Sequence, residues 1–437
     1  MRSSTKVLIV GLSSVVLAVL PSHLGGSGRD GLLGLARGDP LQRDFTLPTP
    51  LFSPTSAWNQ TATKASALVT SDQQILVTYR VLRGDTSSLS PGTQTPRWPF
   101  PYVNYDDYTI PVFRMGATRT SVASRDYAGN LTWPSPKSPV AQLGGPVTVP
   151  APAGTVRPAG PLGTDADGHL VLYDPATFME YDFWQATTAR DAAGRSLGGG
   201  QLGTAILETG AVDSCDVRGA GASPPTYSSA RATGTPLLAG LILPEDVERG
   251  VIAHALGFVI PGPRNTSANP SAPLPSDYFY PVSTTETDFY NTNPLSLAAG
   301  QRIRLKRTIV NADGNPIFDE KQLAPITRML LAVLRTYGAY LVDGSGGFGF
   351  YAEDIHTANL RLSDEKVNAL IGQPTDAPLP TGKTKWQVVI EKLNQDLEQI
   401  PIAYGPWKQG QNPATATMTA SNFDVVEPAL ASGTAQP

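Results

Sequence analysis

The chain has 437 residues, of which 41% are hydrophobic and only 16% are charged, and its formal net charge is −4. Proteins that bind the phosphate backbone cluster Lys and Arg, and this chain has no basic run, so we expect no nucleic-acid partner. Its 42 glycines and 40 prolines predict many turns in a folded chain. The single cysteine, Cys215, excludes an internal disulfide.

The N-terminus has the pattern of a secretory signal peptide. Arg2 and Lys6 precede the apolar run Val7–Leu20, which is shorter than the roughly 18 apolar residues that suggest a transmembrane helix. No A-x-A cleavage site follows, so an uncleaved anchor is the alternative. We expect a secreted or extracytoplasmic protein (periplasm or cell surface) with no transmembrane segment in the mature chain. Its expected parts are a signal peptide (1–25), a linker (26–50), a single β-rich domain (51–407) and a disordered tail (408–437).

Strand-like runs dominate the first half of the chain. Gln74–Leu82 (QILVTYRVL) alternates apolar and polar residues, as a half-buried strand does. Tyr108–Arg114 and Thr118–Ala123 also predict short strands. His169–Asp174 and Phe178–Gln185 are separated by three residues, which predicts a β-hairpin.

Helices enter in the second half. Pro244–Arg249 predicts a short helix, with proline first and acids in the first turn, and Val251–Pro261 predicts a buried strand. Ala324–Tyr337 and Lys383–Gln399 carry apolar residues at helical spacing, and Ser363 is the expected N-cap of a helix between them. Because short strands prevail and βα alternation is absent, we predict a mainly β fold. The expected architecture is an antiparallel β-sandwich or jelly roll with a few peripheral helices in the C-terminal third.

Two acids on one predicted strand are the leading candidates for proton transfer. Glu180 and Asp182 are two residues apart, so both carboxyls point to one face of the strand, and Trp184 continues that face. Two acids in apolar surroundings raise each other's pKa, which suits one to donate and one to accept a proton. An aromatic ring beside them would offer a platform for a sugar ring. The alternative interpretation is a solvated strand face.

Two histidines and an aspartate complete the candidate site. His169 and His254 lie in apolar runs, so each is either a hydrogen-bonded core residue or a site residue. We expect His254 to be desolvated and neutral near pH 7, with Glu180 or Asp343 accepting its N–H. The predicted catalytic residues are Glu180, Asp182, His254 and Asp343. The predicted substrate-binding residues are His169, Trp184, Tyr181 and Tyr290.

Metal and nucleophile motifs are absent. The sequence has no H-x-H, H-E-x-x-H or C-x-x-C spacing, so no metal ligands and no cofactor are predicted. Calcium is the alternative, because the turn Asn311–Asn315 (NADGN) offers oxygen ligands; the simpler interpretation is a tight turn. No G-x-S-x-G elbow occurs, and Cys215 has no neighbouring base in the sequence, which indicates a plain half-buried thiol.

Four motifs together resemble an uncharacterised family of secreted bacterial β-rich proteins. They are PTSAWN (Pro54–Asn59), the hairpin HLVLYD with MEYDFWQ, LPEDVERGVIAHALGF, and RTYGAYLVDGSG. The resemblance covers residues 50–355 and implies export and a β fold. It implies that His169, Glu180, His254 and Asp343 are the polar positions of the pattern.

Taken together, these features predict a secreted carbohydrate-active protein, a polysaccharide hydrolase or lyase that uses carboxylate and histidine acid–base chemistry. In the hydrolase version Glu180 or Asp182 is the acid and Asp343 the partner carboxylate. In the lyase version His254 is the base and Tyr181 the proton donor.

The alternative is a non-catalytic glycan-binding or envelope-associated structural protein. An enzyme needs a pocket where these side chains converge, whereas a binding module shows a shallow aromatic strip. The expected partner is a polysaccharide or glycan, and the oligomeric state is left open.

Overall fold

The computed structural model describes the central and C-terminal parts of the chain, all within the compact unit Asp39–Pro437. The described residues are 41–63, 65–91, 98–124, 147–160, 167–190, 192, 199–222, 230–270, 273–287, 289–310, 319–400 and 421–426. The predicted signal peptide and the turn Asn311–Asn315 lie outside them.

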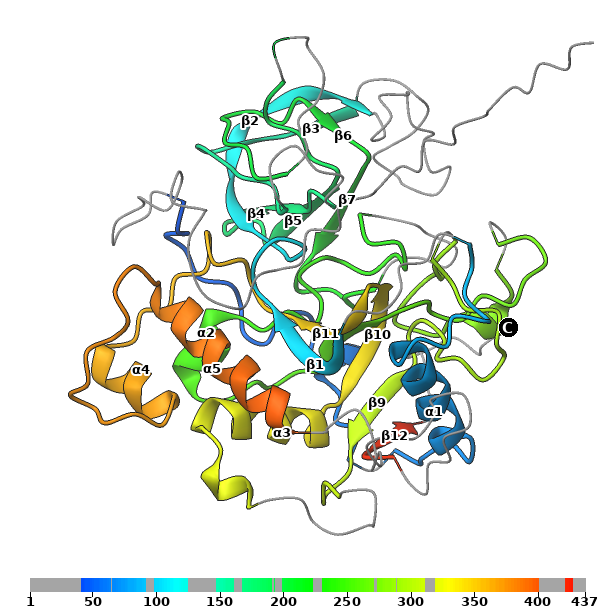
Figure 1. Ribbon diagram of the computed structural model, residues 1–437. Helices are drawn as coiled ribbons and strands as arrows, with labels where there is room; N and C mark the ends of the chain where they lie inside the picture. Colours follow the sequence, from blue (N-terminus) through cyan, green and yellow to red (C-terminus); the bar gives the residue numbers. More distant parts are fainter. Residues whose placement is uncertain are drawn as a thin grey trace, which may run out of the picture. The chain divides into compact units, whose positions relative to one another are not determined.

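The first of two sheets has six strands in the order β1–β11–β8–β10–β9–β12 (Figure 1). The pairs β1/β11 and β8/β10 are parallel and the other three pairs are antiparallel. The strands β8 and β11 are buried at every residue, as expected of a sheet covered on both faces. The strands are β1 (Trp98–Asn104), β8 (Leu256–Ile260), β9 (Arg302–Leu305), β10 (Ala339–Gly344), β11 (Gly347–Tyr351) and β12 (Phe423–Val426).

The second sheet runs in the order β3–β2–β4–β5–β7, with β6 pairing to β2. The predicted hairpin is confirmed as the antiparallel pair β4/β5, in which Leu170 lies opposite Phe183. The strand β2 runs parallel to both β4 and β6. The strands are β2 (Val112–Ser124), β3 (Val147–Pro152), β4 (Leu170–Asp174), β5 (Met179–Trp184), β6 (Glu208–Thr209) and β7 (Ala211–Asp216).

Both sheets are therefore mixed, and the fold is an α/β fold with two open six-stranded sheets. The predicted abundance of strands is confirmed, but the antiparallel sandwich or jelly roll is wrong. The parallel pairs join segments far apart in the sequence, such as β1 with β11. Local periodicity indicates that a segment is a strand, but it carries no information about which strand is its neighbour or in which direction that neighbour runs.

Five helices occur in the described residues, and four of them were predicted. Ser363 caps α4 as expected, because its side chain accepts a hydrogen bond from the main-chain N–H of Lys366. No helix in this part of the chain is long and apolar enough to cross a membrane. The helices are α1 (Ser71–Leu82), α2 (Pro244–Arg249), α3 (Pro325–Thr336), α4 (Asp364–Leu370) and α5 (Lys385–Gln399), besides short 3₁₀ turns at Ala57–Asn59, Pro275–Asp277 and Glu320–Gln322.

The strand predicted at Gln74–Leu82 is wrong, because these residues belong to the helix α1. Its residues Ile75, Tyr79 and Leu82 enter the core at positions i, i+4 and i+7, which is helical spacing. The same short apolar run fits a period of two nearly as well as a period of 3.6, so periodicity alone does not separate the two structures.

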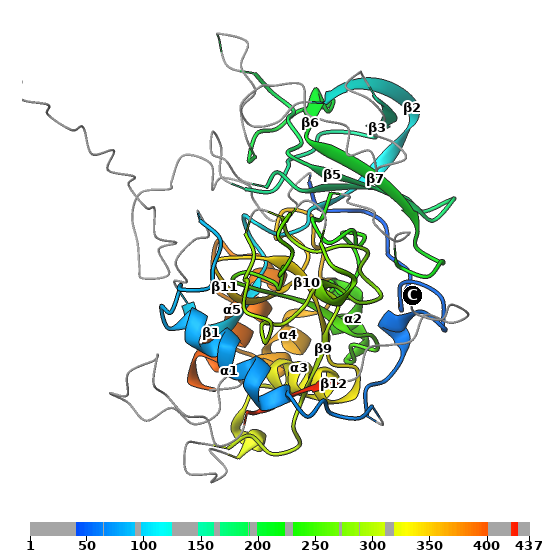
Figure 2. The same cartoon turned by 90° about the vertical axis from the view of Figure 1, so that its right-hand side faces the viewer.

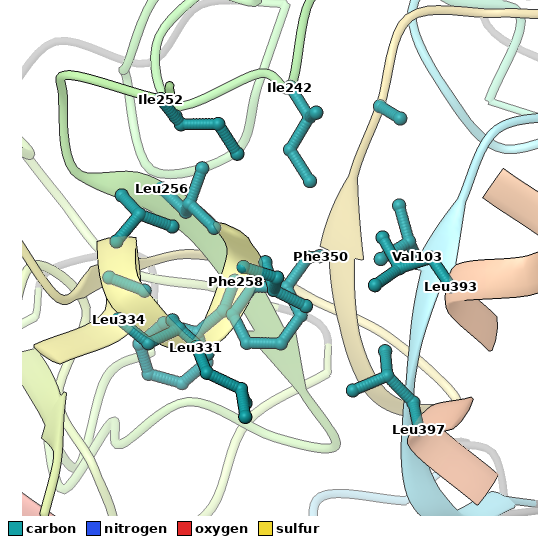
Figure 3. Packing of buried hydrophobic residues seen from close by; sticks show 14 of the residues in the cluster. Val103, Ile242, Ile252, Leu256, Phe258, Leu331, Leu334, Phe350, Leu393 and Leu397 are labelled. Atoms are coloured by element: carbon teal, nitrogen blue, oxygen red, sulfur yellow. The ribbon is translucent and has the colours of Figure 1, made fainter. Parts of the chain in front are cut away.

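Helices cover one face of the first sheet. The side chains of α3 and α5 pack against β8 and β11 in the largest apolar cluster. Figure 3 shows Leu331 and Leu334 of α3 and Leu393 of α5 around Phe258 and Phe350 of the sheet. The apolar stripes predicted for α3 and α5 are buried in this layer.

The second sheet covers the opposite face of the first. Tyr340 and Val342 of β10 belong to the same apolar cluster as Val171 and Tyr173 of β4, whereas Leu341 belongs to the helix-side cluster. This alternation is the period of two that a strand buried on both faces must show. Figure 2 views the two groups of strands from the side.

Two segments expected outside the domain belong to it. Phe423–Val426, within the predicted disordered tail, forms β12 and pairs with β9, so the tail prediction is wrong for this segment. Its FDVV sequence is apolar and β-branched, unlike the Ala-, Thr- and Pro-rich residues around it. Within the predicted linker, Arg43, Phe45 and Leu47 are buried.

Arg43 fixes the segment 41–48 to the domain through a buried ion cluster. Its Nε lies 2.7 Å from Oε1 of Glu353, and its Nη1 lies 2.6 Å from Oε1 of Glu245. The three side chains are at most 9% exposed. Because Glu245 lies in α2 and Glu353 follows β11, one guanidinium joins three distant parts of the chain.

We predict that Arg43→Ala lowers the free energy of unfolding by about 3–5 kcal/mol, because it leaves two buried carboxylates without their cation. Denaturant unfolding at neutral pH measures this loss. Lys383→Ala is the control, since it removes the more exposed ion pair with Glu391 and should cost less than about 1 kcal/mol. Equal losses in the two variants would contradict the role of Arg43.

Candidate functional site

The two predicted acids lie between the two sheets. Glu180 is paired across the hairpin with Tyr173 and on its other side with Cys215. Asp182 is paired in the same way with Val171 and with an acid that sequence analysis did not select, Asp213. Directly paired residues share a face of the sheet, so these carboxyls point with Tyr173 toward the first sheet. Glu180 is 0% and Asp182 1% exposed, so the solvated-face alternative is wrong.

The acids have little hydrogen bonding for such buried groups. Oδ2 of Asp182 accepts a 2.9 Å hydrogen bond from the main-chain N–H of Leu237. Oδ1 of Asp182 has no hydrogen-bond partner among the described residues. The oxygens of Glu180 have no partner of ordinary hydrogen-bond geometry there, although the nearby main-chain N–H of Leu238 partly opposes the rise in the pKa of Glu180. Burial raises the pKa of Glu180 well above its usual value, and the charges of Asp182 and Asp213 raise it further. Burial also raises the pKa of Asp182 to about 8, so burial favours the protonated form of both carboxyls.

A buried arginine lies within electrostatic range of these acids. Arg231 is 1% exposed, and its guanidinium donates hydrogen bonds of 3.3 Å to the main-chain carbonyls of Pro236, Leu237 and Ala239. It opposes the rise in the pKa of both Glu180 and Asp182. Sequence analysis missed Arg231, because a lone arginine in the loop-like segment PTYSSARATG gives no local sign of burial.

His169 and Asp343 lie in the same electrostatic neighbourhood. His169 is buried, with Nε2 3.3 Å from the carbonyl oxygen of Ala230, and its Nδ1 has no partner among the described residues. Burial lowers its pKa, while the charge of Asp343 opposes that effect and the charge of Arg231 adds to it. Oδ1 of Asp343 accepts a 3.0 Å hydrogen bond from the N–H of Gly344. The predicted residues Glu180, Asp182, His169 and Asp343 thus share one buried region, but no described hydrogen bond joins them.

His254 lies apart from this buried region, and its partner is Asp246 rather than the expected Glu180 or Asp343. Its Nε2 lies 3.1 Å from Oδ2 of Asp246, and its Nδ1 lies 3.0 Å from the carbonyl oxygen of Ala255. Burial lowers its pKa, but Asp246 and the carbonyl outweigh burial, so the pKa is raised rather than lowered as expected. Asp246 occupies this position because its Oδ2 also accepts the N–H of Leu243 at the start of α2. His254 therefore connects α2 to the entry of β8.

The three aromatic candidates do not converge. Trp184 lies on the acid face, as the period of two predicts. Tyr181 lies on the opposite face of β5, where it packs with the third apolar cluster and where the guanidinium of Arg119 lies 5.7 Å from its ring centre. Tyr290 lies in a loop, where its main-chain N–H bonds to Oγ of Ser90.

An open hollow of about 440 Å³ lies at the end of the β4–β5 hairpin. Its walls come from the segment 44–48, from β2, from the turn of the hairpin and from the loop before α4. None of the predicted catalytic or substrate-binding residues lines it. The charged and aromatic residues of the lining are Asp44, Phe45, Arg114, Tyr173, Phe178 and Arg361.

Three aromatic residues line this hollow, and of these only the half-buried Phe178 offers ring surface, because Tyr173 is 0% and Phe45 6% exposed. Phe45 stacks on Tyr173 with ring centres 5.6 Å apart, and the guanidinium of Arg218 lies 4.8 Å from the ring centre of Phe178. Phe178 has φ of 63°, a left-handed conformation that glycine or asparagine adopts at lower cost. Such strain is found at functional sites, which makes this turn a candidate for a role in binding.

One further group has side chains of the types that bind metals. Ligand atoms of Asp106, Asp354 and His356 lie within 4.8 Å of one another. Oδ1 of Asp354 is 2.7 Å from Nδ1 of His356. On the other side of the same imidazole, Nη1 of Arg157 is 2.7 Å from Nε2 of His356. The positive charge of Arg157 therefore lies beside the imidazole of this group.

Comparison with known proteins identifies no relative. No family model matches the chain, and neither a curated protein nor a solved structure shows significant similarity to it. Its resemblance to a family of secreted bacterial proteins therefore stays a prediction.

We predict that the buried acids make stability fall as the pH rises. Their raised pKa values mean that the folded state keeps protons that the unfolded state loses above about pH 4. This contribution is fully present below about pH 4 and is lost as the pH rises through the folded pKa of Asp182, about 8. In this window Asp182→Asn or Glu180→Gln should reduce the slope of unfolding free energy against pH by up to about 1.4 kcal/mol per unit.

Urea unfolding at several pH values measures these slopes. Asp174→Asn is the control, because hydrogen bonds from Thr177 and Ala176 lower the pKa of Asp174, so its removal should leave the slope above about pH 5 unchanged. Wild-type slopes in both acid variants would contradict the protonated state of the acids.

Proposed function

We propose that this protein acts outside the cytoplasm and binds glycans in the hollow at the end of the β4–β5 hairpin. One observation carries the proposal: the hollow combines aromatic rings and arginines, and none of the predicted proton-transfer residues lines it. The one carboxylate in the lining, Asp44, has no second carboxyl or histidine beside it there, so the hollow suits binding better than acid–base catalysis. The basic, then apolar, N-terminus supports the extracytoplasmic location.

The composition of the hollow suits a saccharide. Sugar rings have an apolar face that packs on aromatic side chains and a polar edge that accepts hydrogen bonds. Phe178 is half-buried in the turn and offers part of its ring, while Arg114 and Arg361 offer donors beside it. A volume of about 440 Å³ lies within the usual range of ligand sites.

Acid–base catalysis on polysaccharide is the second candidate. The observation in its favour is the pair Glu180 and Asp182, whose raised pKa values suit a proton donor at neutral pH. Asp343 would be the partner carboxylate. A general acid must come within hydrogen-bond reach of its substrate, and both acids are almost completely buried, so we rank this version below binding. Reducing-sugar release by the wild type that Glu180→Gln abolishes would reverse the order.

We predict that Phe178→Ala weakens glycan binding about tenfold, because loss of ring stacking costs about 0.5–1.5 kcal/mol beyond the lost contact area. Affinity electrophoresis or calorimetry on a panel of neutral and acidic polysaccharides measures the change. Phe289→Ala is the matched control, since Phe289 is 45% exposed and does not line the hollow. Binding that both variants retain at wild-type strength would place the glycan site elsewhere.

A further inference from the structure

We infer that the saccharide bound in the hollow is anionic and that Arg361 recognises its negative group. This inference rests on the proposed function and adds the chemical class of the ligand to it. It starts from the charges along the wall of the hollow.

Arg361 has no counter-ion among the described residues. Its side chain is exposed, and its Nη2 donates one 3.3 Å hydrogen bond to the carbonyl oxygen of Phe45. No carboxylate among the described residues lies within ion-pair distance of its guanidinium. The main-chain N–H of Arg361 donates a 2.6 Å hydrogen bond to Oε1 of Glu248, which anchors the backbone at this residue. An exposed guanidinium on an anchored backbone suits a planar anionic group, which it can bind through two parallel hydrogen bonds.

The second cation of the hollow has only a weak partner. Nη2 of Arg114 lies 3.0 Å from Oδ1 of Asp44, and the Asp44 side chain is 78% exposed. Exposed ion pairs contribute about 0–1 kcal/mol, so a ligand anion can compete with Asp44 at low cost. Two cations against one exposed anion leave the lining of the hollow with a net positive charge.

The cations and the rings meet at the same residue. Phe45 accepts the hydrogen bond from Arg361, stacks on Tyr173 and has the guanidinium of Arg114 5.1 Å from its ring centre. A sugar ring that packs on the half-buried Phe178 lies in a lining that also contains the guanidinium groups of Arg114 and Arg361. A uronic acid carries a carboxylate at the edge of its ring, and a carboxylate is a group that a guanidinium binds.

The wall is held in place before the ligand arrives. Nη1 of the buried Arg43 donates a 2.7 Å hydrogen bond to the same carbonyl oxygen of Phe45, and the N–H of Leu47 donates to Glu245. A site that is already ordered loses less conformational entropy on binding. The ion cluster of Arg43 thus preorganises the binding wall.

The test measures charge selectivity by calorimetry with the full-length protein. The probes are oligogalacturonides and the same oligosaccharides after reduction of their carboxyl groups. A second pair, a sulfated galactan oligosaccharide and its desulfated form, distinguishes a sulfate from a carboxylate as the anion. We expect at least one charged probe to bind about tenfold more tightly than its neutral form, which corresponds to about 1.4 kcal/mol. The preference should weaken as salt is added.

The variants are Arg361→Gln and, as the control, Arg328→Gln. Arg328 is also exposed and also donates only to main-chain carbonyls, those of Lys321 and Leu323, but it lies on α3 and does not line the hollow. Arg361→Gln should remove most of the tenfold preference while its melting temperature stays close to that of the wild type. Arg328→Gln should keep the preference.

The outcomes separate the two proposals. Equal binding of charged and neutral probes, or equal losses in both variants, would overturn the role of Arg361 but leave glycan binding intact. Failure of every probe, charged and neutral, to bind would overturn glycan binding itself. A preference for the sulfated probe alone would support an anionic ligand and assign sulfate as its charged group.

Discussion

The guanidinium of Arg43 is the contact on which the binding side of this domain depends. It forms five hydrogen bonds, one for each of its N–H groups, to Glu245, Glu353 and the carbonyl oxygen of Phe45. A buried arginine is stable only when such partners satisfy its charge and donors. Because its partners come from α2, from the end of β11 and from its own segment, one side chain determines where residues 44–48 lie. Those residues form one wall of the hollow.

The layer between the two sheets is organised by a different kind of polar group. Glu180 and Asp182 share it with Val171, Tyr173 and the apolar face of β10. Burial raises the pKa of both acids, which favours their neutral form over a buried charge. Arg231 stays within electrostatic range of them while it bonds to main-chain carbonyls. The layer therefore accommodates Glu180 and Asp182 more readily as neutral carboxyls than as carboxylates.

Elements set by neighbouring residues could be predicted from the sequence, and contacts between distant residues could not. The hairpin β4/β5, the cap at Ser363 and the shared face of Glu180, Asp182 and Trp184 follow from local spacing. The parallel strand pairs, the burial of the acids and the partner of His254 depend on which distant segment packs against each residue. The hollow joins residues 44–48, 114, 173–178 and 361, so no spacing pattern could reveal it. Arg43 was missed for the same reason, because its partners are more than 200 residues away.

A crystal structure of the protein with an oligogalacturonide tests most directly whether a saccharide lies in the hollow with an anionic group at Arg361. We expect sugar density beside Phe178, with a carboxylate at hydrogen-bond distance from the guanidinium of Arg361 and with the wall at residues 44–48 unmoved. Density for the sugar at the acids between the sheets, with the hollow empty, would contradict the account and favour catalysis by Glu180 and Asp182.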